Sequence, residues 1–324
     1  MLLRIAAAIL FAMGPVGAEA QQSPSKVYRI GFITTTSPGM GSIELFRQGL
    51  KEAGYAEGKN VIIVARFASG RLERLPELVG DVLGQKVDVL VVNSTQTALA
   101  AKRATSTVPI VFASVFDPVA AGIVQSLARP GGNITGTALA VGGDFGGKWV
   151  ELLKEAVPGM SRAAVLWNSA NASSGQSVQA IQAAARTLRV QLDLFDAPDA
   201  AGLEKALSAI AASRAQGLII APDPYFNASR TKLVRFAATQ RLPAVYFFRS
   251  FADAGGLVAY GANNADSIRA AAIYVDKILK GAKPADLPVD QPTRFELVIN
   301  LRTAKALGLK LPRSLLVRAD QLIE

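Results

Sequence analysis

The sequence predicts an α/β protein made of two doubly wound parallel-sheet lobes joined by three crossover segments. Apolar, β-branched strands alternate with amphipathic helices, the alternation breaks at a glycine-rich stretch and restarts, and further elements follow the second set. Strands that are nearly continuous apolar runs are typical of parallel sheets covered by helices on both faces. Of the 324 residues, 50% are hydrophobic and 19% charged, so each lobe can bury a core of its own.

The first lobe begins with an apolar strand that ends in turn residues. The helix that follows has Ile43, Phe46 and Leu50 at helical spacing and Gly54 at its C-terminal end. The same pattern then recurs along the chain. In order, the predicted elements are strand 27–34, helix 42–53, strand 61–67, helix 72–83, strand 87–93, helix 95–105 and strand 109–116.

Turn residues gather at 129–136 and in glycine pairs at 142–143 and 146–147, which predicts a passage between the lobes. The second set is predicted as helix 148–156, strand 163–168, helix 177–188, strand 190–195, helix 200–212, strand 217–221, helix 230–239 and strand 243–248.

The last elements predict that the chain returns to the first lobe and crosses once more, which would form a hinge. They are strand 257–260, helix 266–279, strand 295–300 and helix 303–307. The predicted N-terminal lobe is therefore 27–137 plus 258–285. The predicted C-terminal lobe is 138–257 plus 286–324.

Residues 1–20 have the features of a signal peptide for export to the periplasm. A positive end at Met1–Arg4 precedes an apolar run that ends at Met13, and Ala18-Glu19-Ala20 is a small-x-small cleavage site. The apolar run is well short of the roughly 20 residues that a membrane helix needs, which favours a cleaved signal over an anchor. We expect the mature protein to start near Gln21. Because no cysteine follows, a lipid tether through a thioether is excluded.

The composition excludes much of enzyme chemistry. The chain has no Cys and no His, which removes thiolate nucleophiles, imidazole bases and the commonest metal ligands. We therefore expect no catalytic residue, no metal and no cofactor. The formal net charge is +10, but Lys and Arg are scattered, so no nucleic-acid partner is expected. The densest basic stretches, 71–74 and 230–235, are interpreted as solvated helix faces, with steering of an anionic ligand or contact with an acidic partner as the alternatives.

Candidate binding residues follow the strands, because the crevice of an open parallel sheet lies outside the carboxyl ends of its strands. Hydroxyls and helix N-termini suit a carboxylate, an aspartate suits an ammonium group, and rings suit an apolar body. Helix capping is the alternative for Ser94, Thr95 and Asp117, and core packing is the alternative for the rings. The candidates are Thr35, Thr36, Asn93, Ser94, Thr95, Asp117, Asn168, Asp223, Tyr225 and Phe248.

Several segments resemble the ABC transporter substrate-binding family related to tryptophan- and tyrosine-binding proteins. They are Phe116-Asp117-Pro118-Val119, the run 126–136 (SLARPGGNITG), the run 278–284 (ILKGAKP) and the run 304–309 (AKALGL). The resemblance implies a type I periplasmic-binding-protein fold, whose lobes close around a small solute and dock onto an ABC permease in the inner membrane. It implies an aromatic or other amino acid as the solute. We expect a monomer.

Three alternatives stay open at this point. A secreted enzyme of similar lobed fold would use Ser94 or Ser37 as nucleophile, although no base is visible. A ligand sensor domain would present its solute to a membrane partner. A transcription regulator of the same fold would need a helix-turn-helix where this chain has its signal segment.

Overall fold

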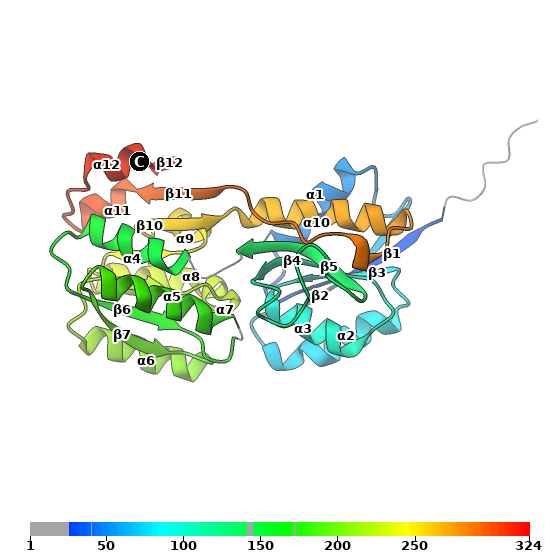
Figure 1. Cartoon of the computed structure of the whole chain (residues 1–324), viewed down its shortest axis with the longest axis horizontal. Coiled ribbons are helices and arrows are strands. Elements are labelled where there is room, and N and C mark those ends of the chain that lie inside the picture. The colour runs from blue at the N-terminus through cyan, green and yellow to red at the C-terminus, as the bar shows by residue number, and fades with distance from the viewer. Residues whose placement is uncertain (1–25, 40, 141–144, 172) are drawn as a thin grey trace, which may run out of the picture.

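The computed structural model describes residues 26–39, 41–140, 145–171 and 173–324. The predicted signal peptide, its cleavage site and the glycine pair 142–143 lie outside these residues. Figure 1 shows two lobes side by side along the long axis, each with a sheet between layers of helices. Within the part of the chain that the structure describes, no helix is both long and apolar enough to span a bilayer.

The first sheet has five parallel strands in the order β2-β1-β3-β4-β5. Its strands are β1 (Tyr28–Thr34), β2 (Val61–Phe67), β3 (Val89–Asn93), β4 (Ile110–Phe116) and β5 (Ile134–Ala140). The helices between them are α1 (Ser42–Glu52), η1 (Leu72–Arg74), α2 (Leu75–Gly84) and α3 (Thr95–Ala104). Every residue of β3 is buried, which explains its uninterrupted apolar sequence.

The second sheet has seven strands in the order β12-β11-β10-β9-β8-β6-β7. They are β6 (Arg162–Trp167), β7 (Gln191–Asp196), β8 (Leu218–Ile220), β9 (Ala244–Tyr246), β10 (Val258–Ala262), β11 (Phe295–Asn300) and β12 (Gln321–Ile323). The predicted parallel arrangement is confirmed for β6 to β10, which repeat the strand order of the first sheet, whereas β11 joins β10 antiparallel.

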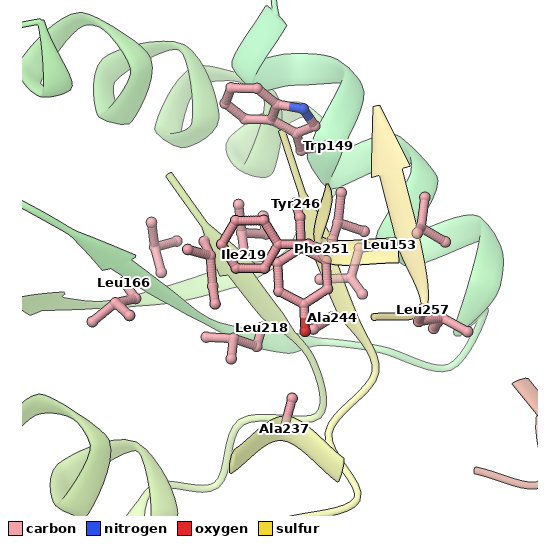
Figure 2. Packing of buried hydrophobic residues seen from close by; sticks show 14 of the residues in the cluster. Trp149, Leu153, Leu166, Leu218, Ile219, Ala237, Ala244, Tyr246, Phe251 and Leu257 are labelled. Carbon is pink, nitrogen blue, oxygen red and sulfur yellow. The ribbon is translucent and has the colours of Figure 1, made fainter. Parts of the chain in front are cut away.

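Helices cover both faces of the second sheet. They are α4 (Phe145–Ala156), α5 (Ser174–Thr187), α6 (Ala200–Ala212), α7 (Pro224–Ala228), α8 (Arg230–Thr239), α9 (Arg249–Asp253), α11 (Leu301–Ala306) and α12 (Arg313–Val317). Figure 2 shows Trp149 and Leu153 of α4 over the side chains of the central strands. There the ring of Tyr246 stacks on that of Phe251 at 4.6 Å between centroids. Such close packing fixes the strand ends that reach the site.

Three segments connect the lobes, as predicted. They run from β5 to α4, from β10 to α10 (Asn264–Leu279), and from η2 (Pro284–Asp286) to β11. Helix α10 lies on the first lobe against α1, and a Cβ on Gly49 would be only 2.7 Å from the Arg269 carbonyl oxygen. Asp290 is hydrogen-bonded to β5, because Ala138 N donates to its carbonyl oxygen over 2.8 Å. The chain thus leaves the first lobe for the last time after Asp290.

The structure corrects the predicted boundary at 285/286, because the chain stays with the first lobe through Asp290. It also moves two strands across the predicted boundaries. Residues 134–140 form a strand of the first sheet, so the turn residues before them are not the passage between the lobes. Residues 258–262 belong to the second sheet, because β10 pairs with β9 and β11. In both cases strand pairing decides the placement, and pairing is a long-range property that local composition does not record.

Candidate functional site

A cavity of about 250 Å³ lies between the lobes. It opens at the carboxyl ends of the parallel strands, where the order of each sheet reverses: between β1 and β3 in the first lobe, and between β6 and β8 in the second. From the first lobe and α10 it is lined by Thr35, Thr36, Ser42, Leu45, Asn93, Ser94, Thr95, Ser114, Phe116, Leu139, Asn264, Ala265 and Ile268. From the second lobe and the connection after it, it is lined by Asn171, Pro224, Asn227, Arg230, Phe248, Arg249, Ser250, Asp253, Ala262 and Asn263.

The first-lobe wall offers polar atoms that the protein leaves unpaired. Thr35 is 3% and Asn93 is 7% exposed, and neither Thr35 Oγ1 nor Asn93 Nδ2 has a hydrogen-bond partner. A buried polar atom without a partner costs roughly 1–3 kcal/mol. Since both residues line the cavity, a polar atom of a bound solute can satisfy them. These two atoms are the strongest sign of a ligand in the structure.

Ser94 and Thr95 place the start of α3 at the cavity. Ser94 caps the helix, because its Oγ accepts a hydrogen bond from Thr97 N over 3.2 Å. Its backbone φ of 144° is rare for a residue with a side chain, and such strain is concentrated at functional sites. The capping alternative is therefore confirmed for Ser94, and it is compatible with a place on the cavity wall.

Asp223 is buried behind the second-lobe wall. It is 2% exposed, and it accepts four hydrogen bonds: from the Tyr225 and Phe226 amides, and from the side chains of Asn168 (3.1 Å) and Asn171 (2.8 Å). Burial raises the pKa of Asp223, although all four donors act to lower it. Because four donors occupy its lone pairs, Asp223 orients Asn171 toward the cavity. This placement does not favour the contact with an ammonium group that the sequence predicted for an aspartate at this site.

Aromatic side chains form an apolar part of the cavity wall. Phe116 and Phe248 line it from opposite lobes, and Phe247 lies between them. The ring centroids are 4.7 Å apart for Phe116 and Phe247 and 4.9 Å apart for Phe247 and Phe248, both edge-to-face. Phe116 and Phe248 thus give the cavity wall an apolar surface against which an apolar body can pack.

Four sequence-predicted residues lie outside the cavity lining: Asn168 and Asp223, which are buried behind it, and Asp117 and Tyr225. Asp117 Oδ1 accepts a hydrogen bond from Ala120 N over 3.0 Å, but the chain forms a turn there and no helix lies among the described residues between β4 and β5, so the helix-capping alternative is wrong. Tyr225 is half-buried at the rim, where a Cβ on Gly70 of the first lobe would lie 3.9 Å from Tyr225 Cδ2. Tyr225 is thus part of the contact between the lobes.

The two rims touch across the cavity. Ser173 Oγ of the second lobe donates a hydrogen bond to Thr95 Oγ1 of the first over 3.2 Å. Together with the contact between Phe116 and Phe247, this bond shows that the lobes are closed around the cavity. This hydrogen bond would break when the lobes open, so it stabilises the closed state.

Sequence reasoning missed part of the second-lobe wall and the start of α10. Arg230 had been interpreted as part of a solvated helix face, yet it lines the cavity. Asn264 reaches the site because its Oδ1 accepts from Ser114 Oγ at an irregular point of β4. A signal was available for Arg249, which begins α9 soon after the end of β9, but not for Arg230, which begins α8 only after the intervening α7.

Two α/β lobes, three connections and a polar cavity at facing strand ends define a two-lobed solute-binding protein. Residues 37–323 match the profile of the family described as ABC transporter substrate binding protein, and this chain belongs to that family. Proteins of this family bind a small-molecule solute for an ABC transporter. The resemblance, the two-lobed fold and the solute-binding role expected from the sequence are therefore confirmed.

Several relatives support the same conclusion. The Tyrosine-binding protein of Clostridioides difficile (strain R20291) is 26% identical over 265 residues, which cover 82% of this chain and 76% of that protein. A conserved domain protein from Vibrio cholerae is 28% identical with a TM-score of 0.85, covering 92% of this chain and all of the other. An ABC domain from Streptococcus pneumonia in complex with L-Trp is 25% identical with a TM-score of 0.84, with the same coverage.

Proposed function

We propose that this chain is the periplasmic receptor of an ABC importer and that it closes over one aromatic amino acid or a closely related aromatic acid. The observation that carries the proposal is the pair of unpaired polar atoms, Thr35 Oγ1 and Asn93 Nδ2, in a cavity that also has rings on its wall. A cavity of about 250 Å³ suits a single small solute. The relatives named for tyrosine and bound to L-Trp support the same ligand class.

In the proposed complex the first lobe supplies the polar contacts, and both lobes supply rings. The Thr35 hydroxyl and the Asn93 amide donate to an oxygen of the solute, and Phe116 and Phe248 hold its aromatic body. The solute first binds one lobe, and closure adds the contacts of the other. The solute thereby shifts the population toward the closed state.

The surroundings of this receptor are part of the proposal. Residues 1–20 direct export and are removed near Ala20, the mature protein is a monomer, and its membrane partner is a permease in the inner membrane. An enzymatic role is not proposed, because the family and the relatives are binding proteins and the Ser94 hydroxyl is used to cap α3. The sensor alternative shares the same cavity and differs only in its membrane partner.

The proposal is tested by calorimetric titration of the mature protein, after unfolding and refolding to remove any bound solute. The panel is L-Trp, L-Tyr, L-Phe, indole-3-propionate and, as a sugar control, D-glucose. We expect saturable 1:1 binding of at least one aromatic compound and none of glucose. Glucose binding with no response to the aromatic compounds would refute the ligand class.

Replacing Thr35 by Val should separate binding from stability. Valine has the same shape but lacks the hydroxyl that the empty protein leaves unpaired, so the empty protein should gain about 1 kcal/mol of stability. Affinity for the bound aromatic compound should fall about tenfold, because one hydrogen bond is lost. Denaturant unfolding and calorimetry measure the two quantities. Unchanged affinity would remove Thr35 from the binding site.

A further inference from the structure

Three charged residues are found among the described residues that line the cavity: Arg230, Arg249 and Asp253. Arg249 has two acidic neighbours, Asp253 at 3.5 Å and Glu296 at 3.9 Å, so its charge is balanced within the protein. Arg230 forms no ion pair with any described acidic residue. The cavity wall therefore carries one arginine whose charge the described part of the protein does not balance.

The Arg230 guanidinium is oriented but has donors to spare. Its Nη1 donates to the Asn227 carbonyl oxygen over 3.1 Å, and Asn227 Oδ1 accepts from Ser250 Oγ over 2.8 Å. Both of these neighbours also line the cavity. A guanidinium has five N–H donors in a planar fork that fits a carboxylate. With one donor fixing its position, the others are available to a ligand.

Closure of the lobes raises the energetic cost of the unbalanced charge on Arg230. Arg230 is half-buried, and a cation that loses water without gaining an anion is costly. Arg230 stands at the start of α8 in the second lobe, whereas Thr35 and Asn93 belong to the first. An acidic group on the solute would therefore favour the closed state, and an empty cleft would oppose it. A solute without an acidic group would leave the loss of water from Arg230 on closure uncompensated.

We propose that Arg230 is a specificity-determining residue that contacts a carboxylate of the solute from the second lobe, so that the cleft selects aromatic acids over the corresponding amines. This inference rests on the proposed function, because it concerns the solute of the same cavity. It adds that binding requires the carboxylate, and it identifies Arg230 as the residue that contacts this group. The assignment of a solvated helix face to 230–235 holds for Arg235, which is exposed, but not for Arg230.

The test uses three compounds with one ring system: L-Trp, indole-3-propionate, which lacks the ammonium group, and tryptamine, which lacks the carboxylate. Binding is measured by calorimetry on the mature protein and on the variants Arg230→Gln and Arg230→Lys. Arg235→Gln is the matched control, since it removes a charge from the same helix without altering the cavity wall. Thermal unfolding of each variant shows whether it is folded.

We expect the wild type to bind at least one of the two acids and to bind tryptamine at least 100-fold more weakly. Arg230→Gln should weaken binding of that acid by about 30-fold or more, Arg230→Lys by less, and Arg235→Gln by less than about twofold. Wild-type affinity for the acid in a folded Arg230→Gln protein, or equal binding of tryptamine by the wild type, would overturn the inference alone. Binding of none of the three compounds by the wild type would overturn the proposed ligand class and this inference with it.

Discussion

Replacing Asp223 by Ala is expected to lower the affinity for the solute at least 100-fold and the free energy of unfolding by about 3–5 kcal/mol. The change removes the acceptor of four hydrogen bonds from a site that is 2% exposed. Two of the released donors are the side-chain amides of Asn168 and Asn171, and the other two are the first amides of α7. Because Asn171 lines the cavity, its loss of position reaches the solute directly.

Asp196 provides the matched control for this prediction. It is the last residue of β7 in the second lobe and accepts hydrogen bonds from Ser169 N at 2.9 Å and Ser169 Oγ at 2.7 Å, but it is exposed. Asp196→Ala should cost no more than about 1 kcal/mol and leave affinity unchanged. Denaturant unfolding and calorimetric titration measure both variants. If Asp223→Ala resembled Asp196→Ala in both measurements, the positioning role of Asp223 would be wrong.

Gly136→Ala should destabilise the first lobe by more than about 3 kcal/mol, one of the largest effects expected from a single methyl group. A Cβ at this position would lie 1.9 Å from the Phe112 carbonyl oxygen and 2.7 Å from the Phe112 carbonyl carbon. Both atoms belong to the backbone of β4, so neither can move aside as a flexible side chain would. The φ of +153° at Gly136 adds strain for any other residue.

Gly84→Ala is the control for the same chemical change. Gly84 lies at the end of α2 and has no atom within 4 Å of the added Cβ, so alanine should be neutral or stabilising by up to about 1 kcal/mol. Calorimetric melting measures both variants. A melting temperature of Gly136→Ala within two or three degrees of the wild type would show that β4 and β5 can separate at little cost.

The alternation of elements could be predicted from local sequence because each strand and helix has a strong pattern of its own. The strand 110–116 and the helix 200–212 agree with the predicted ranges to within a residue. The strand 134–140 could not be predicted in this way, since Gly131 and Gly132 before it and Gly136 within it signal turns. Its strand character comes from pairing with β4, and Gly136 is there because β4 passes so close.

The site could be predicted in part, for a similar reason. Thr35, Thr36, Asn93, Ser94, Thr95 and Phe248 lie on the cavity wall because carboxyl ends of parallel strands meet at one edge. Residue type alone does not distinguish a carboxylate that contacts a ligand from one that orients neighbouring side chains. An ammonium group was therefore expected beside Asp223, whereas its oxygens accept hydrogen bonds from two asparagine side chains and two backbone amides. Arg230 was missed because its place depends on how α7 and α8 meet, which the local charge pattern does not encode.

The central claim is that two lobes close on a solute held between them, and a distance measured across the cleft tests it most directly. The chain has no cysteine, so Glu77→Cys in the first lobe and Ala201→Cys in the second, both at exposed positions, give a uniquely spin-labelled pair. Pulsed electron paramagnetic resonance should show a broad or longer distance in the solute-free protein. Saturation with the aromatic compound that binds in calorimetry should shift the distribution to one shorter distance. An identical distribution with and without that compound would contradict the account.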